Sequence, residues 1–399
     1  MTTPKEACRL TIGSCMEDSV SKGRLRVLIV GFGIAGATLA ALLSQRGIHP
    51  AVIERADKGE SEGYVLGLYP LGSRVLYGLN MHRRYRDIST KMERYVLHDP
   101  SGKILKEFPL DSINERYGDI RGVDRKLMLS LLRSGVPEEN VFYNTTIQHI
   151  QNNDQNVIVT FSDGSTQMFD LVVGADGIHS EVRALLLSRN EFSYRPTGWG
   201  AWGLWRSLEG FDRSTYREVW ADGWFVGLYP VQERLAVFIG GNKKMLADYT
   251  PAQYATMLQE RIEAGILHSA LQSLEGLEDS FFWNMEDCRS SLWSRNRVVL
   301  LGDAAAAFLP TAGIGASMAM DSAAVLADEL SRTDALHLSG AITKYVARQR
   351  IKTERAQNNS RFLAFLMFKQ AAATVQIRNS IVRKCSLNSL LKNIVRIMN

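Results

Sequence analysis

The chain has 399 residues, of which 45% are hydrophobic and 22% charged, and its formal net charge is +5. This length predicts two domains or one large domain with an insertion, and the ordinary composition excludes a low-complexity protein. The residues before Arg24 lack the apolar run of a signal peptide, and no later stretch is long and uncharged enough to span a bilayer, so we expect a cytoplasmic protein. The spacing of the four cysteines fits neither a disulfide framework nor a zinc site, so we expect free thiols and no metal.

The first informative segment is a glycine-rich turn between a short apolar run and a helix. Residues Val27–Val30 predict a buried parallel strand, and Gly31, Gly33 and Gly36 follow with the spacing Gly-x-Gly-x-x-Gly. Gly31 permits the tight turn, Gly33 leaves room for a pyrophosphate, and Gly36 lets helix and strand pack closely. The first amides of the helix are then free to bind phosphate.

An acid follows at the end of a second predicted strand, Ala51–Ile53. Glu54 lies 21 positions beyond Gly33 and fits the acid that accepts hydrogen bonds from a ribose. An acid at this position repels a 2′-phosphate, so the ligand should be FAD or NAD rather than NADP. The alternative is a structural glycine turn with a solvent-facing glutamate.

Two further segments combine a buried strand with a turn and a helix. Residues 171–173 predict a strand, 174–177 a turn that contains Asp176, and 180–186 a helix with a serine cap. Residues 300–317 predict a strand that leads into a helix, and their sequence is LLGDAAAAFLPTAGIGAS. Taken alone, Asp176 is equally explained as a turn residue.

The region between these motifs has the alternating pattern of antiparallel strands. Strand character occurs at 92–99, 102–110, 198–208, 216–231 and 234–243, and six of the seven tryptophans fall in this region. We select Arg206, Trp220 and Tyr229 as candidates to face a substrate. The alternatives are that the tryptophans are core residues and that Arg206 forms a salt bridge at the sheet edge.

The C-terminal region is strongly basic. Residues 351–399 hold nine lysines and arginines but one glutamate, interleaved with apolar residues such as Phe362, Phe365, Ile377 and Ile381. Two interpretations stay open: a helix that packs its apolar stripe on the body, and a helix that touches anionic lipid. No nucleic-acid-binding module surrounds these charges, so we expect no nucleic acid partner.

The three motifs, in this order, resemble those of the FAD-dependent aromatic hydroxylases, single-component flavoprotein monooxygenases similar in fold to para-hydroxybenzoate hydroxylase. "GADGIHSEVR" resembles the family's Asp-Gly motif, and "GDAAAAFLP" with "GIGAS" resembles its third motif. The resemblance spans residues 24–330. It implies an α/β fold, in which a Rossmann-like FAD-binding domain of the glutathione-reductase type is interleaved with a mainly antiparallel substrate domain and followed by a helical C-terminal segment.

The resemblance also implies domain boundaries. The expected division is an N-terminal extension (1–24), a discontinuous FAD-binding domain (25–84, 108–188 and 284–345), a substrate domain (85–107 and 189–283) and a basic helical segment (346–399).

The same resemblance implies roles for individual residues. Asp303 would accept hydrogen bonds from the ribitol chain, Asp176 would lie at the pyrophosphate, and Pro310 would lie at the flavin face. The residues expected to bind FAD are Gly31, Gly33, Ile34, Ala35, Gly36, Glu54, Arg55, Gly67, Arg125, Asp176, Gly302, Asp303, Pro310, Gly313, Gly315, Ala316 and Ser317.

The implied reaction uses NADPH or NADH as a transient hydride donor and O2, through a flavin C4a-hydroperoxide, to hydroxylate or epoxidise a small aromatic or apolar substrate. The catalytic residues stay open, because Ala306 and Ser317 stand where many relatives have His and Asn. The alternatives are a reductase or dehydrogenase, a halogenase, and a non-catalytic flavoprotein peripheral to a membrane. Both a monomer and a homodimer are compatible with the sequence.

Overall fold

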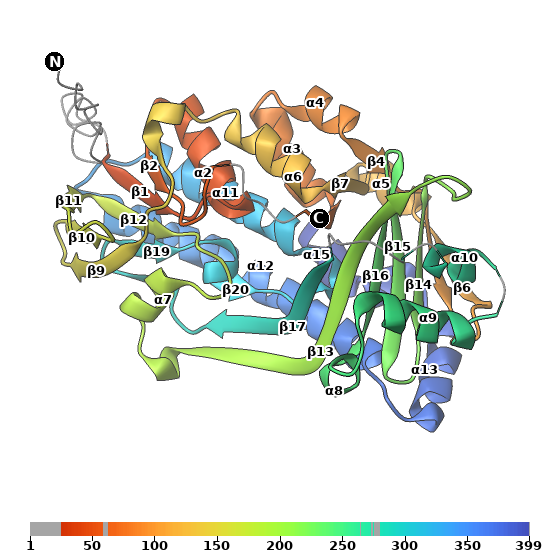
Figure 1. Ribbon diagram of the computed structural model, residues 1–399. Helices are drawn as coiled ribbons and strands as arrows, with labels where there is room; N and C mark the ends of the chain where they lie inside the picture. Colours follow the sequence, from red (N-terminus) through yellow and green to blue (C-terminus); the bar gives the residue numbers. More distant parts are fainter. Residues whose placement is uncertain (1–24, 59–62, 264, 273, 275–279, 399) are drawn as a thin grey trace, which may run out of the picture.

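The computed structural model describes residues 25–58, 63–263, 265–272, 274 and 280–398 (Figure 1). The predicted N-terminal extension, with Cys8 and Cys15, lies outside the described residues. Cys288 and Cys385 are free thiols.

The nucleotide-binding motifs lie on a six-stranded sheet with the strand order β18-β19-β12-β1-β2-β8. The central strands β1, β2, β12 and β19 pair in parallel and are fully buried, which explains their unbroken apolar sequences. The strands are β1 (Val27–Val30), β2 (Ala51–Ile53), β8 (Val141–Phe142), β12 (Leu171–Gly174), β18 (Ser294–Arg295) and β19 (Val298–Leu300). The predicted fold class is therefore confirmed for this half of the chain.

Helices pack against this sheet and share one hydrophobic core with it. The helix after the first glycine turn, α2, packs against α11, which starts in the third motif. The helices of this half are α2 (Ile34–Gln45), α3 (Pro70–Gly78), α4 (His82–Asp87), α5 (Asp111–Tyr117), α6 (Arg125–Arg133), α7 (Glu181–Leu186) and α11 (Gly315–Ser331).

The second large sheet has eight strands in the order β20-β17-β13-β16-β15-β14-β5-β6. Its pairs are antiparallel except β14 with β5, which run parallel. The strands are β5 (Arg94–His98), β6 (Ile104–Pro109), β13 (Phe192–Ser207), β14 (Thr215–Trp220), β15 (Trp224–Val231), β16 (Arg234–Asn242), β17 (Phe281–Ser290) and β20 (Ala306–Ala307), and α8 (Lys243–Leu246), α9 (Pro251–Arg261) and α10 (Ile266–Leu271) lie on its outer side. Strands β6 and β17 cross the domain boundaries predicted at 107 and 283.

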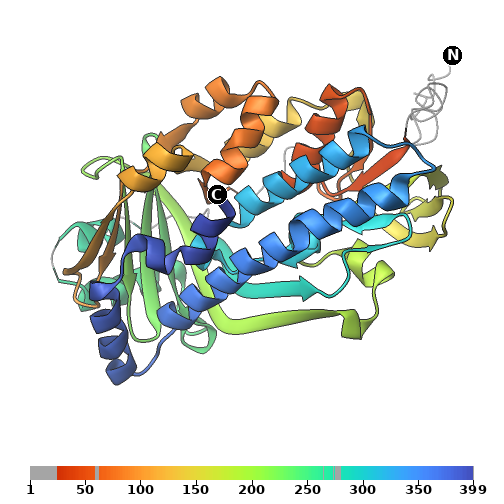
Figure 2. The ribbon, with the colours of Figure 1, turned by 180° about the vertical axis from the view of Figure 1, so that it is seen from behind.

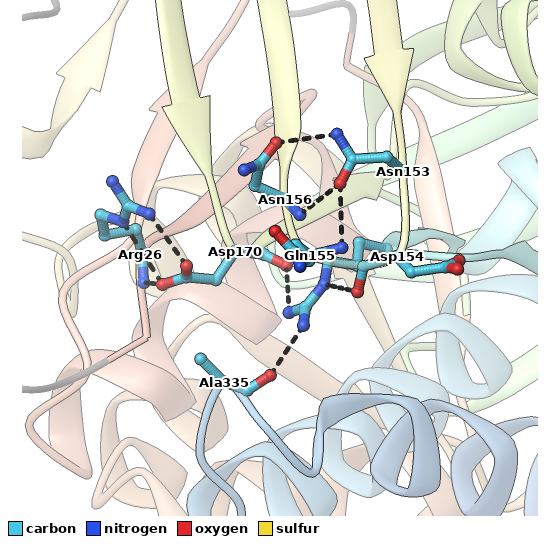
Figure 3. Close-up of polar contacts among 8 residues, drawn as sticks. Arg26, Asn153, Asp154, Gln155, Asn156, Asp170 and Ala335 are labelled. Carbon is cyan, nitrogen blue, oxygen red and sulfur yellow. Dashed lines mark hydrogen bonds and ion pairs between the residues drawn. The ribbon is translucent and has the colours of Figure 1, made fainter.

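Two three-stranded sheets complete the body. They are formed by β3 (Val65–Leu68), β7 (Arg121–Asp124) and β4 (Ser89–Lys91), and by β11 (Thr166–Phe169), β10 (Val157–Phe161) and β9 (Ile147–Asn152). Arg26, just before β1, forms an ion pair with Asp170, just after β11, and so links the two strands (Figure 3). Arg297 donates to the carbonyl oxygens of Asp154 and Ala335, and so links the β9–β10 turn to the loop after α11.

The C-terminal segment is helical, as predicted, and connects the two large sheets. Its helices are α12 (Leu338–Met367), α13 (Ala372–Lys384), α14 (Leu387–Leu390) and α15 (Lys392–Met398). Figure 2 shows α12 running diagonally across the back of the molecule. A buried ion pair fixes it, because Arg361 on α12 contacts Asp287 on β17 at 2.5 and 3.0 Å. No helix among the described residues is long and apolar enough to cross a membrane.

Candidate functional site

One cavity of about 510 Å³ connects the nucleotide-binding motifs with the eight-stranded sheet. Most of the predicted cofactor residues line it, together with the substrate candidates Trp220 and Tyr229. These cofactor residues are Gly31, Gly33, Ile34, Ala35, Glu54, Arg55, Gly67, Arg125, Asp176, Asp303, Pro310, Gly313, Gly315 and Ala316. Residues from three distant parts of the chain therefore meet around one space. Gly36, Gly302, Ser317 and Arg206 do not line it.

The three glycines of the first motif meet different steric conditions. Gly31 has φ +98°, and a Cβ there would lie 2.6 Å from the carbonyl oxygen of Ala175. A Cβ at Gly36 would lie 1.9 Å from the carbonyl oxygen of Gly31, so this glycine serves close packing inside the protein. A Cβ at Gly33 would meet no atom within 4 Å. Gly33 therefore faces open space in the cavity, where the phosphates of a dinucleotide would approach the start of α2.

Glu54 is held at the cavity wall by backbone amides. One carboxylate oxygen accepts from the N–H of Phe32 (2.8 Å) and the other from the N–H of Ala56 (3.1 Å). A carboxylate has about four acceptor positions. Each oxygen therefore keeps a free position, which suits two neighbouring ribose hydroxyls.

Asp303 faces the cavity from the turn after β19. Its side chain is exposed to the cavity although protein surrounds it, and none of the hydrogen bonds found among the described residues ends on its carboxylate. Burial raises the pKa of Asp303 to about 6, against the positive charges of Arg125 and Arg183, which lower it. An acceptor without a protein donor is what a chain of ribitol hydroxyls requires.

Asp176 and Arg183 shape the loops around Asp303. Asp176 accepts from the Ser180 hydroxyl (2.6 Å) and from two amides at the start of α7, so most of its acceptor capacity is used within the protein. Burial raises the pKa of this carboxyl, while these hydrogen bonds lower it. Arg183 is fully buried and donates to the carbonyl oxygen of Ala304 (2.9 Å). It therefore holds the Gly-Asp turn from inside the protein.

The third motif holds the loop before α3. The hydroxyl of Ser317 is buried and accepts from the N–H of Tyr69 (2.9 Å), and the Tyr69 hydroxyl donates to the carbonyl oxygen of Ala312 (3.0 Å). Gly67 lies opposite Gly313, since a Cβ at Gly67 would be 3.7 Å from the carbonyl oxygen of Gly313. Gly315 and Ala316 expose the first turn of α11 to the cavity, where its free amides favour negative charge.

Ala306 lies in the hydrophobic core and does not line the cavity. The position that the resemblance assigns to a histidine in many relatives is therefore held here by a core residue.

Arg206 does not reach the cavity. Its guanidinium donates to the carbonyl oxygens of Ser269 and Ala270 at the end of α10, at 2.8 and 2.7 Å. Side chains alternate along β13, and Trp199 and Trp205 point to the cavity side of the sheet, whereas Leu204 and Arg206 point to the other side. Arg206, a candidate to face a substrate, therefore lies on the side of the sheet away from the cavity.

The cavity wall on the eight-stranded sheet includes residues that we did not predict. Along β14 the side chains of Tyr216 and Glu218 face the cavity together with the predicted Trp220, and Tyr95 on β5 lies beside them. The two-residue spacing of Tyr, Glu and Trp is the signal that identifies this face of the strand. Apolar residues of the C-terminal helices close the chamber: Leu363, Met367, Leu387, Leu390 and Leu391.

The two acids and the open glycine turn fit an extended dinucleotide, with Glu54 at one end and Asp303 at the other. Fold and site together thus define an FAD-binding flavoprotein whose cofactor cavity continues into an apolar chamber on the eight-stranded sheet.

Comparison with known proteins agrees with this class. A family model described as "FAD binding domain" matches residues 24–333. The chain belongs to this family, the flavoprotein monooxygenases of the para-hydroxybenzoate hydroxylase type.

Individual relatives are distant but similar over most of the chain. The FAD-dependent monooxygenase ausM of Penicillium brasilianum is 26% identical in an alignment of 389 positions that covers 86% of this chain and 79% of its own. Among solved structures, Klebsiella pneumoniae HpxO complexed with FAD and uric acid has a TM-score of 0.84 at 21% identity, covering 94% of this chain and 96% of its own. Pseudomonas aeruginosa PqsL with 2-aminobenzoylacetate has a TM-score of 0.78 at 21% identity, covering 90% and 99%. At this identity the structures show the fold alone.

Proposed function

We propose that the protein is an FAD-dependent monooxygenase that consumes NADPH or NADH and O2 and hydroxylates or epoxidises a small aromatic or apolar molecule. The observation that supports this proposal is the single cavity, which runs from the dinucleotide motifs into a chamber lined by Tyr, Trp, Phe and Leu side chains. The FAD-dependent monooxygenases among its relatives add weight to it.

The chain's residues would hold and enclose the cofactor. Glu54 and the amides after Gly33 would bind the ADP half, and Asp303 would accept from the ribitol hydroxyls. The positive end of α11 would stabilise negative charge on the reduced ring. When bound, FAD supplies the redox chemistry by accepting hydride and reacting with O2. The apolar wall from α12 and α14 would keep water from the reacting atoms.

Three measurements test this function. Purified protein should be yellow or become so with FAD, should oxidise NADPH faster with a substrate from an aromatic and isoprenoid screen, and should give a product that carries ¹⁸O from ¹⁸O2. A colourless protein that cannot be loaded with FAD would overturn the proposal. Product formation without O2 would favour a reductase or dehydrogenase, and bromide-dependent products would favour a halogenase.

We also propose that the C-terminal helices touch an anionic lipid surface. Phe362 and Phe365 on α12 and Ile377 and Ile381 on α13 are exposed, and both helix segments lie at the same end of the molecule (Figures 1 and 2). Exposed cations, including Lys384, lie among them. Apolar side chains with lysines and arginines suit phosphate headgroups over acyl chains.

Vesicle binding tests the lipid contact. The protein should sediment with phosphatidylcholine vesicles that contain phosphatidylserine, and replacing these four apolar residues with Ser should abolish this while the FAD content stays unchanged. Leu336→Ser, at an exposed leucine before α12, is the matched control. Truncation is unsuitable, because α12 and α14 wall the cavity. No sedimentation of the wild-type protein would refute the contact.

A further inference from the structure

The substrate chamber contains one charged side chain from the eight-stranded sheet. The other charged residues that line the described cavity belong to the nucleotide-binding motifs or the loops beside them, such as Glu54, Arg55, Arg125 and Asp303. On the sheet side, Glu218 stands among aromatic residues, and none of the ion pairs of the described chain includes it. A carboxylate without a counterion in an apolar chamber needs an explanation, because burial of an unpaired charge is costly.

Three neutral donors hold the Glu218 carboxylate in place. The Tyr229 hydroxyl donates to Oε1 (2.6 Å), and the Tyr95 hydroxyl and the Trp220 indole N–H donate to Oε2 (both 2.7 Å). Gly227 lies opposite Glu218 on β15, and a Cβ there would be 2.5 Å from the Tyr229 hydroxyl oxygen. The missing side chain leaves the space through which Tyr229 reaches the acid.

The three donors leave part of the carboxylate available. Of about four acceptor positions, Oε2 uses two and Oε1 uses one, so Oε1 keeps one position for a further donor. The phenols stay protonated donors, since burial and then the charge of Glu218 hold the pKa of Tyr95 and Tyr229 well above the ordinary value. The chamber therefore presents a fixed negative charge and an acceptor to whatever enters it.

We propose that Glu218 selects the substrate: it binds an apolar molecule through a hydroxyl or ammonium donor and repels a carboxylate. This inference rests on the proposed function and adds the charge class of its substrate. A carboxylate in the chamber would meet the charge of Glu218 with no cation from the sheet to offset it, and in this low-dielectric space the repulsion is weakly screened. A hydroxyl or ammonium group would instead complete the hydrogen bonding of Oε1.

A matched series of ligands tests the selection. The FAD-loaded protein, without NADPH, is titrated calorimetrically at neutral pH with 2-naphthylmethanol, 2-naphthylmethylammonium and 2-naphthoate, which differ mainly in the polar group. We expect the alcohol and the ammonium to bind at least about tenfold more tightly than the carboxylate. Glu218→Gln keeps the size and acceptor oxygen but removes the charge, so it should bind the carboxylate at least about tenfold better than wild type.

Tyr229→Phe is the control, because it removes one donor but keeps the charge and should still reject the carboxylate. Equal affinities of the wild-type protein for alcohol and carboxylate would overturn the proposal, as would no binding of alcohol and ammonium at millimolar concentration or an unchanged preference in Glu218→Gln. The flavin spectrum distinguishes failure of the proposed function from failure of the role of Glu218. Protein that cannot be loaded with flavin contradicts the proposed function, whereas flavin-loaded protein without this selectivity contradicts the role of Glu218 alone.

Discussion

Gly33→Ala should separate cofactor binding from folding. Gly33 has φ −76° and ψ −168°, an extended conformation that alanine adopts without strain, and its new methyl group would meet no protein atom within 4 Å. Alanine restricts the unfolded chain, which stabilises by about 0.4–1 kcal/mol, but it is a poorer helix cap than glycine by a similar amount. The free energy of unfolding of the apoprotein should therefore stay within about 1 kcal/mol of wild type.

The same methyl group should impair FAD binding. It would occupy the space beside the first amides of α2 and disturb one or two hydrogen bonds from N–H to phosphate, each worth about 1.5–3 kcal/mol. The affinity for FAD should fall at least about tenfold. Urea unfolding of the apoprotein and quenching of flavin fluorescence measure the two effects on one preparation.

Gly36→Ala is the contrasting variant. Its Cβ would lie 1.9 Å from the carbonyl oxygen of Gly31, so we expect a loss of folded protein rather than of affinity alone. Wild-type FAD affinity in Gly33→Ala would refute our placement of the dinucleotide, and equal destabilisation in both variants would refute the steric reasoning.

Asp303→Asn should weaken FAD binding about tenfold or more, because an amide replaces an acceptor-only carboxylate; unchanged affinity in a flavin titration would argue against the ribitol role. Since burial raises the pKa of Asp303 to about 6, its protonated form stabilises the apoprotein at about pH 4, and this contribution is lost as the pH rises through 6. A pKa raised from 3.8 to about 6 corresponds to about 3 kcal/mol, and because the side chain contacts water in the cavity we expect about 1 kcal/mol. The free energy of unfolding of the wild-type apoprotein should therefore fall by about 1 kcal/mol between pH 4.5 and pH 8 through Asp303, and urea unfolding of Asp303→Asn should lack this decrease. Asp287→Ala should destabilise by about 3–5 kcal/mol in urea unfolding, because it leaves Arg361 without its buried partner, whereas Glu233→Ala, which breaks an exposed pair, should change little. Ala306→His should cost about 1–3 kcal/mol by overpacking the core and leave the affinity for FAD unchanged; a loss of FAD binding in a folded variant would show that this side chain reaches the cavity.

The parallel sheet and its motifs were predictable from sequence because each depends on local chemistry. A short buried strand, a glycine turn and a helix lie within one continuous segment, so 27–36 could be assigned without distant contacts. The glycine spacing alone does not predict the turn, since the same spacing recurs at Gly198, Gly200 and Gly203 inside strand β13. The flanking strand and helix made the prediction possible.

The substrate chamber was less predictable because it depends on which face each strand presents. Tryptophan density indicates the right sheet, but the face of β13 on which Arg206 falls is set by the packing of that strand. Glu218 escaped notice because its donors come from three strands, and the pairing of β14 with β5 joins segments more than a hundred residues apart. The exposure of Ile377 and Ile381 likewise depends on how α13 packs, which its amphipathic sequence leaves open.

The order of the strands has a consequence for biosynthesis. Strand β1 is made first, yet its neighbour β12 needs residues 171–174, and β12 in turn needs β19 at 298–300. The sheet that carries the first glycine turn therefore cannot close until the residues of β19 have left the ribosome. Leu387, Leu390 and Leu391 follow β19 in the chain, so this part of the cavity wall is completed later than the parallel sheet. In a nascent chain stalled before α14, the aromatic side chains that line the chamber would stay exposed to solvent, and chaperones could bind them.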